Sequence, residues 1–203
     1  MKTAVIYIHG KGGSAAESAH YEPLFPECDV IGFDYHAETP WEAKAEFPAY
    51  VAALREKYDA VYLIANSIGA YFSLHALAEE GIRAAFLISP IVDMEQLIGN
   101  MMQWAGVTEA ELQRRGQIPT DFGEVLSWEY LTYVREHPIT WHTPTFIFYG
   151  GRDSMTSRET ITAFAERIHA ALTILPEGEH WFHTEEQMAF LDQWIRDAEG
   201  GIA

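Results

Sequence analysis

The sequence predicts an α/β protein built on a doubly wound, mostly parallel sheet of about six strands. Six short segments are rich in β-branched and aromatic residues, and segments with helical periodicity follow most of them. The strand segments are apolar almost continuously rather than in alternation, which is typical of strands covered by helices on both faces. Strands that alternate with helices along a chain favour a parallel sheet.

The expected strands are each ended by residues that favour turns, namely Gly, Pro, Asn or Asp. In chain order they are 3–10, 29–35, 60–67, 84–91, 143–151 and 171–178. A single sequence does not determine the order in which they lie in the sheet.

Helical patterns follow four of these strands, and most carry a recognisable start or stop signal. Pro48 lies inside the first pattern and is expected to kink or interrupt it. Gly81 is expected to end the second as a C-cap, and Ser157 to begin the third as an N-cap. Thr184 and Gln187 form a capping-box pattern at the start of the last. The four segments are 41–58, 68–81, 157–170 and 184–201.

One segment, 94–141, interrupts the alternation and carries no strand pattern. We expect it to form a helical insertion, a lid or cap at the carboxyl edge of the sheet, within a single domain that spans 1–203. Its Met and aromatic side chains could line an apolar substrate pocket, or they could only pack the insertion onto the domain. The candidate pocket residues are Met101, Met102, Trp104, Trp128 and Tyr133.

The charge balance bears on the possible partners. Lys and Arg total 13 against 30 Asp and Glu, which gives a formal net charge of −17. Such a charge repels phosphate backbones and anionic lipid surfaces, so we expect neither nucleic acid nor a membrane as a partner. No apolar stretch approaches the roughly 18 residues that a membrane-spanning helix needs.

Cysteine usage and the N-terminal residues bear on the cellular compartment. Cys28 is the only cysteine, so the chain can form neither an internal disulfide nor a Cys/His metal cluster. The apolar run at the N-terminus is too short for the hydrophobic part of a secretory signal. We therefore expect a cytoplasmic protein. The histidines show no paired metal-ligand spacing, and we expect no metal and no cofactor.

A single hydroxyl stands at the boundary between the third strand and the next helix, in the stretch Ala65-Asn-Ser67-Ile-Gly69. A helix that begins directly after Ser67 places the hydroxyl at the carboxyl edge of the sheet. There, free backbone N–H groups and the positive end of the helix dipole can stabilise a developing oxyanion. The small side chains at Ala65 and Gly69 suit the sharp turn. Taken alone, the pattern also fits a serine that only caps the helix.

This stretch resembles the nucleophile elbow G-x-S-x-G of the α/β-hydrolase superfamily, with Ala65 in place of the first Gly. The resemblance spans essentially the whole chain, and it depends on several motifs occurring in the family's order at strand ends. It implies a reduced α/β-hydrolase fold, in which the two strands that usually precede 3–10 are absent.

The resemblance also implies a catalytic triad, because family members place an acid after a later strand and a histidine after the last. Asp153 follows the fifth expected strand in "YGGRDS", and His180 follows the sixth in "PEGEHWFH". Ser67 would be the nucleophile, His180 the general base and Asp153 the group that orients the imidazole. His183 is an alternative base and Asp93 an alternative acid.

The stretch "YIHGKGGS", residues 7–14, lies where the resemblance places half of an oxyanion hole. The backbone N–H groups of Lys11 and Ile68 are the expected donors, with Gly12 as the alternative to Lys11. The Gly-rich order does not match a phosphate-binding P-loop, and His9 is expected to hold the loop in place.

The resemblance therefore implies a serine hydrolase whose partner is a small-molecule ester. A Ser nucleophile in place of Asp argues against dehalogenase or epoxide hydrolase chemistry. We expect esters with small acyl or aryl groups, and the sequence leaves the oligomeric state open. A serine peptidase or amidase, a thioesterase, and a non-enzymatic ligand receptor on the same scaffold are the alternatives.

Overall fold

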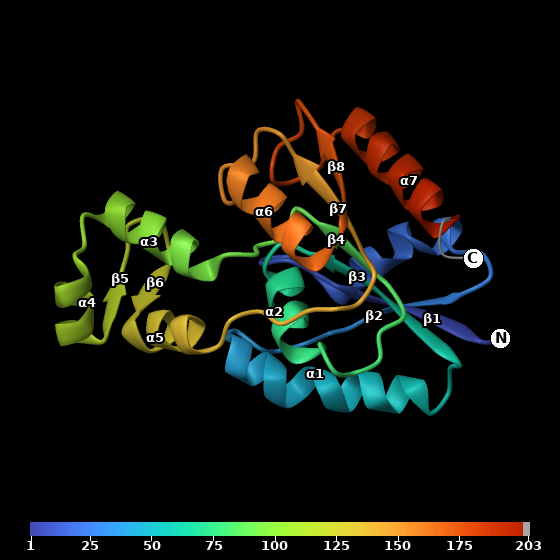
Figure 1. Ribbon diagram of the computed structural model, residues 1–203, viewed down its shortest axis with the longest axis horizontal. Helices are drawn as coiled ribbons and strands as arrows, with labels where there is room; N and C mark the ends of the chain where they lie inside the picture. The colour runs from blue at the N-terminus through green and yellow to red at the C-terminus, as the bar shows by residue number, and fades with distance from the viewer. Residues whose placement is uncertain (201–203) are drawn as a thin grey trace. The chain divides into compact units, whose positions relative to one another are not determined.

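The computed structural model describes residues 1–200, and the chain divides into two compact units (Figure 1). The first unit consists of Met1–Val92 and the chain from Thr140, and the second is Asp93–Ile139. The expected last helix reached residue 201, which lies outside the described residues. Within residues 1–200, no helix has both the length and the apolar character needed to span a membrane.

The first unit contains a six-stranded sheet in the order β2-β1-β3-β4-β7-β8, and every neighbouring pair is parallel. The prediction of a parallel sheet of about six strands is thereby confirmed. The strands are β1 (Thr3–Ile8), β2 (Asp29–Gly32), β3 (Ala60–Asn66), β4 (Ala85–Ile88), β7 (Thr145–Gly150) and β8 (Ala171–Leu175).

The strand order reverses at β1, which lies between β2 and β3. The connections that leave β1 and β3 therefore diverge to opposite faces of the sheet. In open α/β sheets the crevice at the carboxyl ends of two such strands is the usual place for a ligand. The residues that follow β1 and β3, including Lys11 and Ser67, lie at this crevice.

Helices cover both faces of the sheet. On one face α1 (Pro40–Arg55) packs against α2 (Ile68–Ala76), and both contact β3. On the other face lie two 3-10 helices, η1 (Ala15–His20) and η2 (Glu22–Leu24), together with α7 (Glu185–Glu199). Figure 1 shows α6 (Arg158–Ile168) and α7 on opposite sides of β7 and β8.

Aromatic side chains fill the core between the sheet and α7. Phe86 on β4 and Phe148 on β7 both contact Trp194 on α7, with ring centroids 6.1 and 5.2 Å apart. Phe182, from the loop before α7, lies 4.8 Å from Phe148 in the same measure. This packing holds the β8–α7 loop against the sheet, and that loop also carries His180.

The predicted helix signals are confirmed at two N-termini and wrong at one C-terminus. The Ser157 hydroxyl accepts from the Thr160 N–H at the start of α6. Thr184 and Gln187 form the expected capping box of α7. The helix expected to end at Gly81 ends at Ala76 instead, because the chain turns there to enter β4.

Pro48 does not interrupt α1, which continues as one helix from Pro40 to Arg55. Phe47 and Val51 on either side of it are fully buried. Their packing compensates for the backbone hydrogen bond that proline cannot make. The expectation of an interruption was therefore wrong, whereas a kink at Pro48 stays a prediction.

The second unit is mostly helical, and Arg135 links its three helices. The Arg135 guanidinium donates to Glu95 at 2.6 Å and to Glu109 at 2.7 Å. The elements of this unit are α3 (Met94–Ala105), α4 (Glu109–Arg115), β5 (Gln117–Pro119), β6 (Val125–Ser127) and α5 (Trp128–Glu136).

This unit also contains a two-stranded antiparallel hairpin of β5 and β6, where the sequence suggested no strand. Each strand has only three residues, too few for an alternating pattern to be recognised. The turn between them is supported by the Thr120 N–H, which donates to the Glu124 carbonyl at 2.8 Å.

Candidate active site

Ser67 occupies a strained turn between β3 and α2. Its backbone has φ 52° and ψ −119°, a conformation that residues other than Gly rarely adopt. Several backbone hydrogen bonds hold it there: the Ser67 N–H donates to the Ile88 carbonyl at 3.0 Å, and its carbonyl accepts from Ile91 at 3.2 Å. Strain of this kind persists only where the surroundings impose it, and it occurs frequently at functional sites.

Glycines allow the loop after β1 to approach this turn. A Cβ added at Gly69 would lie 2.2 Å from the His9 carbonyl oxygen, so no larger residue fits there. A Cβ at Gly10 would lie 3.2 Å from the Ser67 Cβ. The His9 ring stacks on Tyr35 at 4.4 Å, and the Tyr35 hydroxyl donates to the His9 carbonyl at 2.9 Å. The loop is thus held directly beside Ser67.

The structure brings Ser67, His180 and Asp153 into one hydrogen-bonded chain. The Ser67 Oγ lies 2.8 Å from the His180 Nε2, and the His180 Nδ1 lies 2.7 Å from the Asp153 Oδ2. The Asp153 side chain is fully buried, and the His180 side chain is 22% exposed. Because one ring nitrogen faces a carboxylate acceptor, the other is left to accept the serine proton.

Asp153 is fixed by its own turn at the end of β7. Its Oδ1 accepts from the N–H groups of Met155, at 2.7 Å, and Thr156, at 3.1 Å. The Oδ2 atom then remains for His180. A buried carboxylate that accepts several hydrogen bonds is held in one orientation, and it holds the imidazole in turn.

The loops after β7 and β8 touch each other through glycines. The Arg152 N–H donates to the Gly178 carbonyl at 2.8 Å. A Cβ at Gly150 would lie 2.3 Å from the Glu179 carbonyl oxygen, and a Cβ at Gly151 would lie 2.5 Å from that of Pro176. This contact brings the acid and the histidine together although 26 residues separate them in the chain.

The alternative candidates have other partners. The His183 ring stacks on Trp181 at 4.6 Å, and its Nδ1 lies 2.9 Å from the Trp181 carbonyl. The Asp93 carboxylate accepts from the Gln96 N–H at 2.9 Å and caps α3. His180 is therefore the histidine that contacts Ser67, and Asp153 is the carboxylate that contacts His180.

The two expected oxyanion donors follow the ends of β1 and β3. Ile68 is the first residue of α2, and the N–H of a first helical residue has no acceptor within its own helix. Lys11 follows Gly10 in a turn that the Gly13 N–H closes on the Gly10 carbonyl at 3.1 Å. Gly12 stands in the same turn with φ 75°.

A cavity of about 570 Å³ is lined in part by Lys11 and Gly12, and no sequence motif predicts it. Its lining comes from β1 and the loop after it, η1, the ends of β3 and β4, the β8–α7 loop and α7, which are far apart in sequence. The one local signal is Glu17, which forms a capping box with Ser14 at the start of η1. The lining residues are Tyr7, Gly10, Lys11, Gly12, Gly13, Glu17, His20, Tyr21, Asn66, Ile88, Trp181, Phe182, Met188 and Leu191.

The five candidate pocket residues of the insertion all belong to the second unit. Met101, Met102 and Trp104 lie on α3, and Trp128 and Tyr133 lie on α5. Met102 is buried within the unit, whereas Trp104 is 58% exposed. Their part in a substrate pocket stays a prediction.

No family model matches this sequence, and no curated protein matches it either. Solved structures do match it, at low identity. An α/β hydrolase domain-containing protein 10 from mouse has a TM-score of 0.76 at 16% identity, over 98% of this chain and 90% of that one. Est1E from Butyrivibrio proteoclasticus has a TM-score of 0.75 at 16% identity, with 99% and 88% covered.

The esterase Pf2001 from Pyrococcus furiosus is also similar, with a TM-score of 0.66 at 20% identity over 99% of this chain and 81% of that one. Each match covers nearly the whole of this chain, so the likeness extends over the complete architecture. The strand order, the turn at Ser67 and these matches together show that the chain has the α/β-hydrolase fold.

Proposed function

We propose that this protein is a serine hydrolase that cleaves carboxylic esters with small acyl or aryl groups through an acyl-enzyme intermediate. The hydrogen-bonded chain from Ser67 through His180 to Asp153 carries the proposal. A serine on a strained turn above a helix N-terminus has the position that a nucleophile needs. The esterase Pf2001 among the similar structures supports the same class of chemistry.

In the first half-reaction the Ser67 Oγ attacks the ester carbon while its proton passes to the His180 Nε2. The Asp153 carboxylate stabilises the imidazolium that results. When the tetrahedral intermediate collapses, the C–O bond to the alcohol breaks and the imidazolium protonates the leaving oxygen. Water then attacks the acyl-serine, His180 takes up its proton, and Ser67 regains that proton as the acid leaves.

The negative charge of the tetrahedral intermediate falls on the former carbonyl oxygen. We assign its stabilisation to the backbone N–H groups of Ile68 and Lys11, with the helix dipole of α2 adding to the effect. We also propose that the second unit acts as the cap and that its Met and aromatic side chains contribute to the substrate pocket.

A panel of p-nitrophenyl esters with acyl chains of increasing length tests the proposal. The native protein should hydrolyse the short members, and Ser67→Ala should lower kcat/KM by several orders of magnitude, as triad deletions do. Ser154→Ala, in an exposed loop position, is the matched control and should retain activity.

Labelling with a fluorophosphonate separates the alternatives. An adduct on Ser67 without ester hydrolysis would favour amides or thioesters as the substrates of the same triad. A protein that is neither labelled nor active would fit a ligand receptor, and equal hydrolysis by Ser67→Ala would place the reaction elsewhere.

A further inference from the structure

The cavity beside the triad is a cleft between the loop after β1, with η1, and helix α7. Its lining includes the direct neighbours of the reacting residues. Gly10 approaches the Ser67 side chain, Asn66 precedes Ser67 and Trp181 follows His180. The cleft lies wholly within the first unit. A group bound in it would extend from the nucleophile toward η1.

One wall of the cleft is apolar and largely aromatic. Leu191 and Phe182 are buried, Met188 is half-buried, and the Trp181 side chain is 70% exposed beside the catalytic loop. Tyr21 continues the wall on the side of η1. Aromatic faces and a flexible thioether favour a flat ring as a ligand. A volume of about 570 Å³ is ample for one ring and its linker.

A chain of polar groups runs along the other side, from the neighbour of the nucleophile to Glu17. The Tyr7 hydroxyl donates to the Glu17 Oε2 at 2.5 Å, and Asn66 lines the cleft with them. Burial raises the pKa of Tyr7 far above its usual value, so this hydroxyl keeps its proton. The Glu17 Oε1 accepts from the Ser14 N–H at 3.2 Å.

These contacts determine which ligand group the polar side can take. Tyr7 uses its one proton toward Glu17. An ionised carboxylate has about four acceptor positions, and the two bonds at Glu17 leave room for more. Glu17 is also exposed to the solvent. At the polar end of the cleft, the Glu17 carboxylate therefore offers an acceptor for a hydrogen bond from a bound group.

We infer that the cleft binds an aryl group that carries a hydroxyl, with the ring against Trp181, Met188 and Leu191 and the hydroxyl donating to Glu17. A neutral donor is favoured over a cation because Lys11 also lines the cleft and its positive charge would repel a cation. That this aryl group forms part of the substrate rests on the proposed ester hydrolysis. The binding itself does not depend on it.

Binding to the Ser67→Ala protein tests the inference without any turnover. Calorimetry would compare 4-ethylphenol with 4-ethylanisole, which has the same ring without the donor. The phenol should bind roughly tenfold more tightly, because a hydrogen bond to a charged acceptor is among the stronger ones. Glu17→Gln should reduce this ratio several-fold, whereas Glu22→Gln, an exposed carboxylate outside the cleft, should preserve it.

A second pair of variants tests the location. Met188→Trp should fill the cleft and weaken the binding of both compounds by roughly tenfold or more. Phe190→Trp on the same helix is the control, since Phe190 is 50% exposed and is not among the lining residues. Equal affinity for the phenol and the anisole, or unchanged affinity in Met188→Trp, would overturn the inference.

Hydrolysis by the native protein separates this inference from the proposed function. The pair of substrates is the p-nitrophenyl esters of 3-(4-hydroxyphenyl)propanoic and 3-(4-methoxyphenyl)propanoic acids. If the protein binds the phenol selectively but hydrolyses no ester, the inference about the cleft holds and the proposed ester hydrolysis is refuted. If the protein hydrolyses short esters but does not bind the phenol, the proposed ester hydrolysis holds and the inference about the ligand of the cleft is refuted.

Discussion

The backbone of Ser67 is held in an unfavourable conformation at the candidate active site. Its backbone conformation, with φ 52°, is unfavourable by an amount on the order of 1–3 kcal/mol for a residue with a Cβ. The hydrogen bonds to the β4 end hold it there, and the same turn directs the hydroxyl at His180. Stability is thus reduced at the residue that we assign as the nucleophile.

The strain can be measured by comparing two variants that both lack the hydroxyl. Ser67→Gly should have a free energy of unfolding about 1 kcal/mol higher than Ser67→Ala, since only Gly adopts this φ without strain. The gain is reduced by the greater freedom of Gly in the unfolded chain. Urea denaturation of the two proteins would measure it. A less stable Gly variant would mean that the turn is not strained.

The two histidines of the β8–α7 loop provide a matched pair. His180→Ala should lower kcat/KM for a short ester roughly 10⁴-fold or more, because both the base and the link to Asp153 are lost. His183→Ala should change it less than about threefold, since its contacts are with Trp181. Steady-state kinetics decides between them. A larger loss for His183→Ala would reverse the assignment of the base.

At the scale of elements, the approach of α2 to the loop after β1 depends on one missing side chain. Gly69→Ala should lower the free energy of unfolding by about 3 kcal/mol, because its Cβ would meet the His9 carbonyl oxygen. Gly99→Ala in α3, where an added Cβ meets nothing within 4 Å, should instead raise it by about 1 kcal/mol. Chemical denaturation followed by circular dichroism measures both. Two variants of equal stability would contradict the close approach.

Helix α1 tests how far packing compensates for a poor helix former. Pro48→Ala should raise the free energy of unfolding by about 2 kcal/mol, because it restores a backbone hydrogen bond in the helix interior. Pro40→Ala, at the first helical position where proline is tolerated, should change it by less than about 1 kcal/mol. Thermal and urea unfolding provide the comparison. No gain from Pro48→Ala would mean that the helix is already relaxed around the ring.

At the scale of the whole molecule, a buried tyrosine, Tyr149, and a half-buried one, Tyr35, make stability sensitive to alkaline pH. Burial and the nearby Asp153 raise the pKa of Tyr149 to about 12, and burial with Glu46 does the same for Tyr35. A pKa that is raised in the folded state contributes stability below the unfolded value near 10. That contribution is lost as the pH rises from about 10 to about 12.

The free energy of unfolding should therefore fall between pH 10 and pH 12. In the Tyr149→Phe protein it should fall less steeply over the same range. The variant should start from a lower value at pH 8, because the Thr156 carbonyl loses the 2.8 Å hydrogen bond from Tyr149. Urea midpoints at pH 8, 10 and 11 give both quantities. An equal slope in the variant would show that Tyr149 does not contribute to the alkaline loss.

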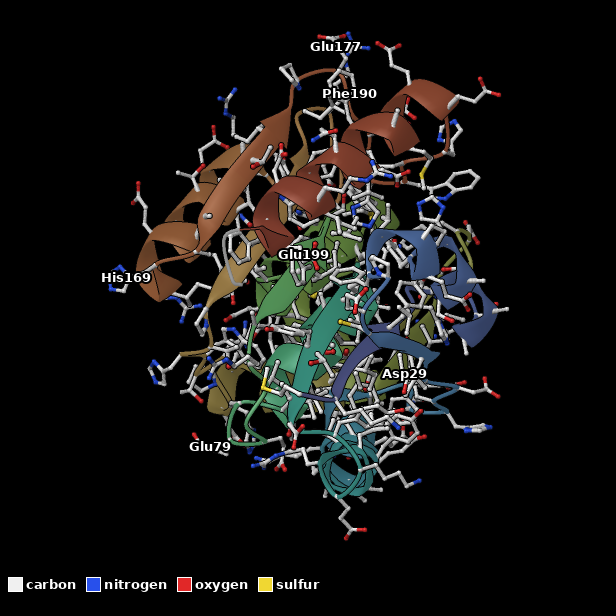
Figure 2. The ribbon with its side chains drawn as sticks, turned by 90° about the vertical axis from the view of Figure 1, so that its right-hand side faces the viewer. Asp29, Glu79, His169, Glu177, Phe190 and Glu199 are labelled. Carbon is white, nitrogen blue, oxygen red and sulfur yellow. The ribbon has the colours of Figure 1, made fainter. Side chains whose placement is uncertain are left out.

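The distribution of surface charge is also a property of the whole molecule. Polar side chains such as those of Glu79, His169 and Glu177 lie at the edge of the molecule in Figure 2 and point away from the sheet. A net charge of −17 spread in this way places no local requirement on the fold. The sequence could therefore be interpreted for its core pattern without regard to most of its charged residues.

The patterns that predicted correctly are those with a local cause. Continuous apolar runs predicted the parallel sheet because both faces of each strand are covered. Ser157 and Thr184 marked helix starts because a cap acts within one turn. The continuity of α1 through Pro48 and the β5–β6 hairpin were missed. The first depends on packing, and the second on strands too short to show a period.

The sequence by itself determined the parallel α/β sheet and, through the order of its motifs, the choice of Ser67, Asp153 and His180 as candidates. Only the tertiary structure decided that these three side chains touch, because contacts between loops after β3, β7 and β8 set the distances. The cleft with Glu17 is equally a tertiary feature. Its lining comes from distant segments, and no local pattern encodes a space between them.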